Sequence, residues 1–279
     1  MYNSKCFIAF RLRAFVQGGI HLLSGLILAS FLKRKEFKVG VAFGAIFPDI
    51  DLFIAAIAYL FIGESAEKLH RTFTHSLFFI LLVCGSIAIY PYARKFLTKK
   101  AADSSNYDFT GFALGLALGM ITHVILDLFY LVGVSIFWPF YQRPIGFPLV
   151  PDNKLTILQL KLLQTTDFYT DIFLFYIPML ILSYRLNVHK KLRLPFLLYI
   201  VVDFSVITFF VIYSFNNNVS YNDHLVYLYY PGTFFLLISV FSPLLFRDVI
   251  RQFKFKPTEI VIVTSLFLFS QFLFGLFLI

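Results

Sequence analysis

Long apolar stretches separated by short polar segments dominate this chain. Eight of them approach the roughly 20 mostly apolar residues that a helix needs to cross a bilayer. They run approximately over residues 15–32, 39–62, 73–92, 109–133, 167–184, 194–214, 225–246 and 257–278. The pattern predicts an all-α fold, a polytopic membrane helical bundle of about eight transmembrane helices.

The second apolar stretch contains Pro48. A proline inside a helix lacks the backbone N–H donor, and its ring clashes with the preceding turn. We therefore predict that the second helix is broken at Pro48.

Composition agrees with a membrane protein, since 59% of the residues are hydrophobic and only 14% are charged. The net charge of +9 would suggest nucleic-acid binding in a soluble protein, but the basic residues lie in short runs between apolar stretches. Such runs indicate on which side of the membrane each loop lies, and we expect no nucleic-acid partner. Cys6 and Cys84 are isolated, so no disulfide is expected.

The loops predict an orientation, because 16 of the 24 Lys and Arg residues fall on one face of the predicted bundle. By the positive-inside rule this face is cytoplasmic. The N-terminus then lies outside, which Lys5, Arg11 and Arg13 oppose. A re-entrant or tilted first segment is the alternative.

Several histidines and aspartates interrupt the apolar sequence. A charged group at the bilayer centre costs about 2.5–3.5 kcal/mol on insertion scales, so a cluster of such groups needs a compensating partner. The predicted topology brings all of them to the outer, non-cytoplasmic half of the membrane, where a bound cation would compensate them. The candidate metal ligands are His21, Asp49, Asp51, His70, His75, His123 and Asp127.

His123 and Asp127 stand four residues apart, which places both on one face of a helix. At this spacing an imidazole and a carboxylate can reach one ion. An intrahelical hydrogen bond between them is the structural alternative.

Asp49 and Asp51 cannot share a face of a regular helix, but a break at Pro48 lets both point into a cavity. Paired carboxylates suit two bridged metals, or one metal and a general base. We assign the base to Asp49 or Asp51; a Pro-Asp turn at a helix end is the alternative.

His70 and His75 flank a predicted helix start, with Thr72 or Thr74 as its N-cap. Arg71 could clamp a phosphate or carboxylate of a substrate through its planar guanidinium. In isolation these histidines would be solvated surface residues, and Arg71 would be an interface anchor.

Two further residues are weaker candidates. Asp171, with Asp167 near the start of the fifth stretch, is a further ligand, an acceptor for a ligand, or a helix cap. Arg143 lies in the aromatic and proline-rich loop 134–166, which suits the headgroup interface, and it either contacts a substrate headgroup or snorkels.

Together these motifs resemble the YdjM-like family of bacterial membrane-bound metal-dependent hydrolases, and more distantly zinc-dependent phospholipase C-like proteins. The resemblance covers roughly residues 18–172 and implies metal binding by the His and Asp residues and a hydrolase activity. Where the family often shows a threonine after the last aspartate, this chain has Leu128-Phe129-Tyr130, and the family's acidic residue after the long loop corresponds to Asp171. The matching residues are His21, Pro48-Asp49-Ile50-Asp51, His70-Arg71, Thr74-His75-Ser76, His123-Val124-Ile125-Leu126-Asp127, Trp138-Pro139-Phe140 and Arg143.

The sequence thus predicts a metal-site membrane domain over residues 1–184 and additional transmembrane helices, acting as scaffold, over 185–279. We expect a multi-pass protein of the bacterial cytoplasmic (inner) membrane that hydrolyses an ester or phosphoester of a phospholipid or another amphiphile. One or two divalent ions would be bound, with zinc preferred and manganese or iron compatible with the same donors. The alternative is a non-catalytic metal-binding transporter or sensor.

Overall fold

The structure of the chain is a computed structural model that describes residues 18–62, 70–98, 108–129, 133–147, 156–220, 224, 228, 237–254, 256–259 and 261. Within these residues the regular structure is helical, and β pairing is confined to one isolated antiparallel bridge between Val134 and Ile145. The predicted all-α fold is therefore confirmed for the described part of the chain.

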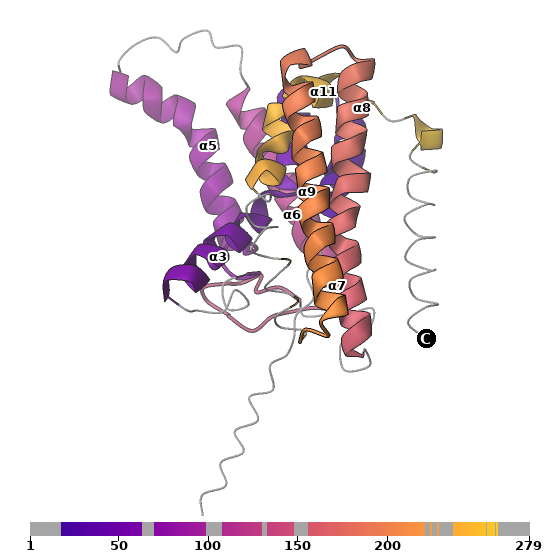
Figure 1. Cartoon of the computed structure of the whole chain (residues 1–279). Helices are drawn as coiled ribbons and strands as arrows, with labels where there is room; N and C mark the ends of the chain where they lie inside the picture. The colour runs from indigo at the N-terminus through magenta and orange to yellow at the C-terminus, as the bar shows by residue number, and fades with distance from the viewer. Residues whose placement is uncertain are drawn as a thin grey trace, which may run out of the picture.

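The helices include a 3-10 turn, η1, and a π-helical turn, η3, which joins α7 to α8 without a break (Figure 1). The bounds are α1 (Gly18–Ser30), α2 (Lys35–Gly44), η1 (Phe47–Asp49), α3 (Ile50–Ile62), α5 (Leu77–Thr98), α6 (Phe109–Leu128), α7 (Ile157–Asp171), η3 (Ile172–Tyr176), α8 (Ile177–Arg185), α9 (Lys190–Asn216) and α11 (Arg247–Gln252).

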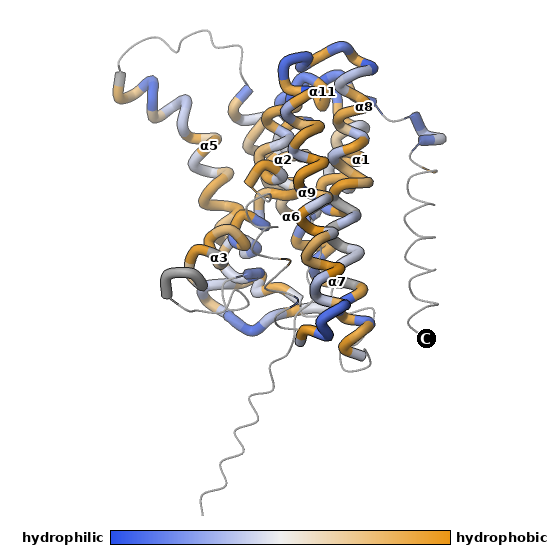
Figure 2. The backbone as a smooth tube through the Cα atoms, in the orientation of Figure 1, coloured by the Kyte–Doolittle hydropathy of each residue, from blue (hydrophilic) through white to orange (hydrophobic). Residues whose placement is uncertain are grey.

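In the described residues, three helical stretches are long and apolar enough to cross a membrane: Leu77–Leu97 in α5, Phe109–Leu128 in α6 and Lys190–Asn216 in α9. Hydrophobic residues follow much of the length of the helices, and hydrophilic ones gather towards the ends of the bundle (Figure 2). The total of about eight membrane helices stays a prediction, because some of the predicted stretches lie largely outside the described residues.

The break at Pro48 is confirmed. α2 ends at Gly44, η1 follows from Phe47, and α3 begins at Ile50. Pro48 lies in the first turn of η1, where a missing N–H costs no helical hydrogen bond. Asp49 consequently ends one helical element while Asp51 lies in the first turn of the next, and both are buried.

Glycines bring α2 and α6 into backbone contact. A side chain at Gly119 would meet the backbone of Val41 and Ala45, so only glycine permits this approach. Small residues at helix contacts are a common means of close packing in membranes. His123, one turn after Gly119, is thereby brought next to the carbonyl of Ala45 at the end of α2. The contact positions are Gly40 and Gly44 on α2, and Gly115 and Gly119 on α6.

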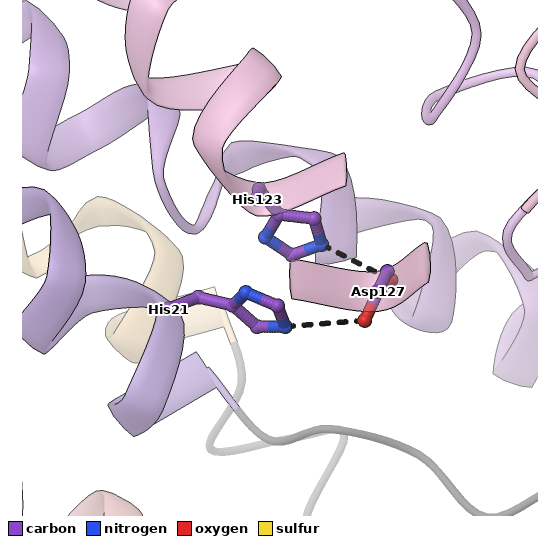
Figure 3. A group of neighbouring side chains, drawn as sticks. All are labelled: His21, His123 and Asp127. Atoms are coloured by element: carbon purple, nitrogen blue, oxygen red, sulfur yellow. Dashed lines mark ion pairs between the residues drawn. The ribbon is translucent and has the colours of Figure 1, made fainter. Parts of the chain in front are cut away.

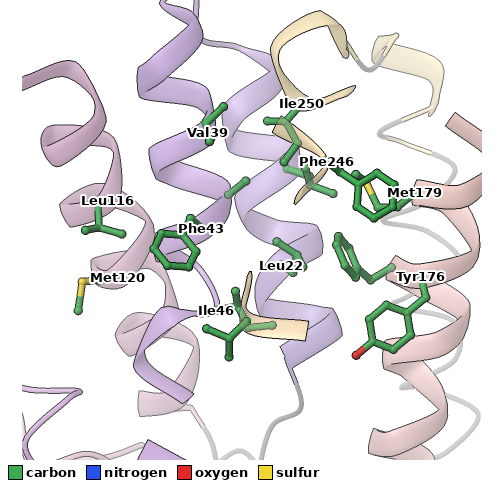
Figure 4. Packing of buried hydrophobic residues seen from close by; sticks show 14 of the residues in the cluster. Leu22, Val39, Phe43, Ile46, Leu116, Met120, Tyr176, Met179, Phe246 and Ile250 are labelled. Atoms are coloured by element: carbon green, nitrogen blue, oxygen red, sulfur yellow. The ribbon is translucent and has the colours of Figure 1, made fainter. Parts of the chain in front are cut away.

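Large buried side chains fill the space between these helices (Figure 4). Leu22 of α1, Phe43 of α2, Leu116 of α6 and Tyr176 of η3 belong to one cluster of buried residues. Lipid tails are as apolar as these side chains, so close packing, more than removal from water, holds the helices together in a membrane.

α5 diverges from the rest of the bundle (Figure 1) and packs mainly against α6. Much of its surface is exposed and apolar: the exposed fraction is 74% at Leu81 and 84% at Phe96. In a membrane these side chains face lipid.

A loop, residues 133–147, packs against the segment 70–77 that leads into α5. The Ser135 N–H donates to the Arg71 carbonyl at 3.1 Å, and the Leu77 N–H donates to the Ile136 carbonyl at 2.9 Å. These bonds fix the segment between Arg71 and Leu77 at both of its ends.

At the opposite end of the bundle, α11 is tied to α2. Arg251 Nη2 donates to Glu36 Oε1 at 2.7 Å, and Lys38 Nζ donates to the Phe253 carbonyl at 3.1 Å. α9 packs against α8 and α7, so helices on both sides of residue 185 are in contact. The division into domains 1–184 and 185–279 stays a prediction.

Candidate metal centre

The seven predicted ligands come together, and each is at most 3% exposed. One donor atom from each of His21, His123 and Asp127 lies within 4.8 Å of the others, and the same holds for Asp49, His70 and His75. Asp51 contacts the second group through His70 and His75. α1, η1, α3, α6 and the segment 70–76 all contribute, so the site depends on the tertiary fold.

Four donor atoms lie at the centre of this cluster. Nε2 of His75 and Nε2 of His123 are 3.1 Å apart. Asp127 Oδ2 lies 3.3 Å from His75 Nε2 and 3.6 Å from His123 Nε2. Asp49 Oδ1 lies 3.8 Å and 3.4 Å from the same two nitrogens. Ligand atoms about 2.0–2.2 Å from a tetrahedral zinc are about 3.3–3.6 Å from one another. The separations among His75 Nε2, His123 Nε2 and Asp127 Oδ2 therefore fit three ligands of one such ion.

The hydrogen bond of His123 fixes its tautomer. Its Nδ1 lies 2.8 Å from the carbonyl oxygen of Ala45. A carbonyl oxygen can only accept, so Nδ1 carries the proton and donates. In the neutral ring, Nε2 then presents a lone pair to the centre of the cluster, as in many metal-binding histidines.

A second chain of hydrogen bonds fixes His75. The Thr74 hydroxyl donates its only proton to Asp51 Oδ2 at 2.7 Å. Thr74 Oγ1 lies 2.9 Å from His75 Nδ1 and therefore accepts from it. Nε2 of a neutral His75 is again the lone-pair nitrogen, and it faces the lone pair of His123.

Among the described residues, no cation lies between the Nε2 lone pairs and the carboxylate oxygens at the centre of the cluster. Asp49 Oδ1 and Oδ2, Asp127 Oδ2 and both ring nitrogens of His21 are buried without a hydrogen bond among the described residues. Buried polar atoms are nearly always satisfied, so this arrangement points to an additional group. The donor set of imidazole nitrogens and carboxylate oxygens fits a divalent metal ion.

The charges lead to the same conclusion. Asp49, Asp51 and Asp127 are carboxylates, and Arg71 Nη2 lies 3.2 Å from Asp127 Oδ1. With neutral histidines, these four side chains have a formal charge of −2. One divalent cation would balance it, whereas an uncompensated buried charge is strongly destabilising.

Asp51 differs from Asp49 in its contacts. Asp51 Oδ1 lies 2.7 Å from His70 Nδ1, and Oδ2 accepts from the Arg71 N–H at 3.1 Å as well as from Thr74. Both of its oxygens are therefore engaged in orienting the segment that carries His70 and His75. The break at Pro48 thus separates Asp51, whose oxygens both accept hydrogen bonds, from Asp49, whose oxygens accept none from the described residues.

Arg71 and His21 both contact Asp127. The Arg71 side chain is buried against Asp127, and its backbone has a positive φ of 59°. His21 Nε2 lies 3.4 Å from the same Asp127 oxygen, and its ring stacks on that of His123 with centroids 3.7 Å apart (Figure 3). The first apolar stretch therefore contributes His21 to the cluster, and the role of His21 as a ligand stays a prediction.

In the segment 70–76, outside the membrane-spanning helices, the surrounding carboxylates and the burial of the site shift the pKa values of both histidines. Burial lowers the pKa of His75, but the carboxylates of Asp51 and Asp127 outweigh it, so the pKa is raised. Burial lowers the pKa of His70 and there outweighs the attraction of Asp51. The region around His75 thus favours positive charge.

The helix cap was predicted wrongly. Ser76, not Thr72 or Thr74, caps α5, because its hydroxyl accepts from the Phe79 N–H at 3.1 Å. The hydroxyl of Thr74 instead forms hydrogen bonds with Asp51 and His75. Asp51 lies 23 residues from Thr74 in the sequence. Sequence spacing gives no signal of such a contact.

The weaker candidates are not brought to the centre by any described contact. Asp171 is the last residue of α7, and its side chain, like that of Asp167, lies outside what the structure describes. Arg143 is exposed on the loop 133–147, so its contact with a substrate headgroup stays a prediction.

Sequence reasoning missed Asp203, which is buried in the middle of α9 with an exposed fraction of 3%. Among the described residues its Oδ1 has no hydrogen-bond partner. An ionisable residue inside an apolar stretch was the signal that selected the candidate ligands, and it applied equally to this position.

Comparison with known proteins identifies one family. The model of the YdjM inner membrane protein family matches residues 16–210, and this range includes all seven candidate ligands and extends into α9. No curated protein and no solved structure matches the chain. Since the match covers well over half of the chain, the protein belongs to the YdjM inner membrane protein family.

Proposed function

We propose that this protein is a membrane-embedded, metal-dependent hydrolase acting on an ester or phosphoester bond of an amphiphilic substrate. The observation that carries the proposal is the arrangement of three donor atoms, His75 Nε2, His123 Nε2 and Asp127 Oδ2, which lie 3.1–3.6 Å apart. Asp49 Oδ1 lies 3.8 Å and 3.4 Å from the same two nitrogens. Zinc suits the tetrahedral spacing and the mixed nitrogen and oxygen donors, and manganese or iron would accept the same donors.

His75, His123 and Asp127 are the proposed ligands. The two histidines present Nε2 lone pairs whose orientation is fixed by hydrogen bonds at Nδ1. Asp127 presents Oδ2, because its other oxygen is held by Arg71. A divalent metal bound here supplies Lewis acidity and lowers the pKa of water towards about 7.

Asp49 is the proposed general base. Its Oδ1 lies beside the same two imidazole nitrogens, and neither of its oxygens accepts a hydrogen bond from a described residue. It is therefore available to take a proton from water, which Asp51 is not. Asp51 is assigned to positioning His70 and His75, and Arg71 to holding Asp127.

The proposed location is the bacterial cytoplasmic membrane, with the site towards the non-cytoplasmic side. The distribution of Lys and Arg over the predicted loops supports this orientation. The site residues His75 and Asp127 lie next to the ends of α5 and α6 that this distribution places outside.

Metal analysis and turnover test the proposal together. The wild-type protein, purified in detergent, should hold about one divalent ion per chain, as the charge balance requires. His123→Ala should lose this ion. Asp49→Asn should retain it but hydrolyse a panel of phospholipids about 100-fold more slowly. His189→Asn, a change at a histidine outside the cluster, is the matched control and should resemble the wild type.

Unchanged metal content in His123→Ala would refute the proposed site. Wild-type turnover by Asp49→Asn would refute the role of Asp49 as the base. Metal binding by a wild-type protein that hydrolyses none of the lipids would favour the transporter or sensor alternative.

A further inference from the structure

Exposed aromatic side chains gather on the loop 133–147 and at the start of α5. The most exposed is Phe140, with 85% of its surface accessible, and Phe147 follows with 64%. Tyr and Trp are enriched at the headgroup interface, and exposed Phe side chains insert at the boundary between headgroups and acyl chains. We call this group the aromatic rim, and it consists of Phe78, Phe137, Phe140, Tyr141 and Phe147.

The rim is continuous with the apolar surface of α5. The rings of Phe78 and Phe140 meet edge to face, with centroids 6.2 Å apart. Phe78 is the second residue of α5, and the next turn carries the exposed Leu81 and Leu82. Since α5 is long and apolar enough to cross a bilayer, the rim begins where the lipid-facing surface of that helix ends.

The loop that carries the rim also holds a segment of the metal centre. The Ser135 N–H binds the Arg71 carbonyl, and the Trp138 ring packs near that of Phe73, with centroids 6.1 Å apart. His75 lies between the two backbone hydrogen bonds that join this loop to residues 71 and 77. The placement of the rim therefore fixes the depth of the metal centre.

That depth coincides with two helix ends. Asp127 is one residue before the end of α6, and His75 is two residues before the start of α5. The 20 residues of α6 span about 30 Å, the thickness of the hydrocarbon core, so the donor atoms lie near its boundary. The ester and phosphodiester bonds of a glycerophospholipid occupy this level of a bilayer.

We propose that the aromatic rim is embedded in the headgroup layer of the membrane and presents the metal centre to glycerophospholipids within the bilayer. The lipid keeps its acyl chains in the membrane, beside α5, while its ester or phosphodiester bond reaches the site. The identity of the substrate rests on the proposed function, whereas the position of the rim does not.

The position can be measured directly, because Trp138 is the only tryptophan of the chain. The full-length protein is reconstituted into phosphatidylcholine vesicles whose acyl chains are brominated near the headgroup or near the bilayer centre. Trp138 fluorescence should be quenched more strongly by the shallow bromines. A double variant, Trp138→Phe with Phe204→Trp in the middle of α9, should show the opposite order. Quenching of Trp138 by aqueous iodide but by neither brominated lipid would overturn the proposal.

Rates of hydrolysis on two substrates, one in vesicles and one soluble in water, distinguish the contact of the rim with the bilayer from the chemical step at the metal centre. Phe140→Ser should hydrolyse phospholipid in vesicles several-fold more slowly than the wild type, with unchanged metal content and an unchanged rate on a water-soluble short-chain phospholipid. Phe96→Ser is the matched control, since Phe96 is 84% exposed at the opposite end of α5, and it should keep the wild-type rate.

Equal loss of both rates in Phe140→Ser, or full activity of this variant on vesicles, would overturn the role of the rim in presenting bilayer lipid to the metal centre. If the wild type hydrolyses neither lipid, the proposed function fails, while the quenching experiment still decides where the rim lies.

Discussion

The imidazole of His123 and the backbone carbonyl of Ala45 are joined by a hydrogen bond of 2.8 Å across 78 residues of sequence. This bond decides which nitrogen of His123 faces Asp49 and Asp127. It forms because Gly44 and Gly119 let α2 and α6 approach closely enough for their backbones to touch. The orientation of His123 therefore depends on Gly44 and Gly119, two residues that have no side chain.

We expect Gly119→Val to disturb the metal centre without changing any ligand. The new side chain would meet the backbone of Val41 and Ala45 and would move the Ala45 carbonyl away from His123. Overpacking of this kind costs about 1–3 kcal/mol. Thermal unfolding in detergent and metal analysis should both show a decrease.

Gly85→Ala is the control for this change, because beyond its own turn of helix no atom lies within 4 Å of the added carbon. It should have the stability and metal content of the wild type. Normal metal content in Gly119→Val would show that the contact between α2 and α6 does not position His123.

The hydroxyl of Thr74 should matter for metal affinity. Thr74→Val keeps the shape of the side chain but removes the group that accepts from His75 Nδ1 and donates to Asp51. Loss of such an outer hydrogen bond typically lowers metal affinity 10–100-fold. Metal titration of the stripped protein measures the effect.

Thr74→Ser retains the hydroxyl and should restore most of the affinity. If Thr74→Val binds metal as tightly as the wild type, another group fixes the tautomer of His75, and the assigned chain of hydrogen bonds is wrong.

Removal of the metal should lower the stability of the protein. The three buried carboxylates would be left with Arg71 as their described guanidinium partner. A ligand present at 100 times its dissociation constant stabilises the folded state by about 2.7 kcal/mol. Unfolding temperatures before and after chelation, and after addition of zinc, should show the loss and its recovery.

His123→Ala provides the control, since a protein that binds no metal should be insensitive to the chelator. A wild-type protein whose unfolding temperature is the same with and without chelator would speak against a buried metal.

The ion pair between Arg251 and Glu36 should contribute to the attachment of α11 to α2. Both side chains are partly buried, and their charged atoms are 2.7 Å apart. A double-mutant cycle with Arg251→Ala and Glu36→Gln should give a coupling of about 1 kcal/mol.

The pair of Arg247 and Asp248 is more exposed and is separated by 3.9 Å, so its coupling should be well below this value. Strict additivity of Arg251→Ala and Glu36→Gln would show that the pair does not hold α11.

The clustering of the seven candidate residues was predictable because the physical signal is local. A histidine or aspartate inside an apolar stretch requires a buried partner, and all seven residues selected in this way lie in one cluster. The break at Pro48 was predictable for a similar reason, since proline acts on the turn that precedes it.

The roles within the site were not predictable from sequence. Asp49 and Asp51 are two residues apart, and only the path of the chain after the break distinguishes the engaged carboxylate from the less constrained one. The contacts of Ala45 with His123 and of Thr74 with Asp51 join distant segments. Asp203 carried the same local signal as the ligands and was overlooked in a region interpreted as scaffold.

The glycine contact between α2 and α6 has a consequence for the tolerance of this sequence to variation. Positions such as Gly44 and Gly119 carry no functional group, yet a side chain at either would collide with the backbone of the neighbouring helix. In a scan of all substitutions scored by activity, these positions should be as intolerant as the proposed metal ligands. Loss of activity alone would therefore not distinguish a residue that binds the ion from one whose absence of side chain makes the binding geometry possible.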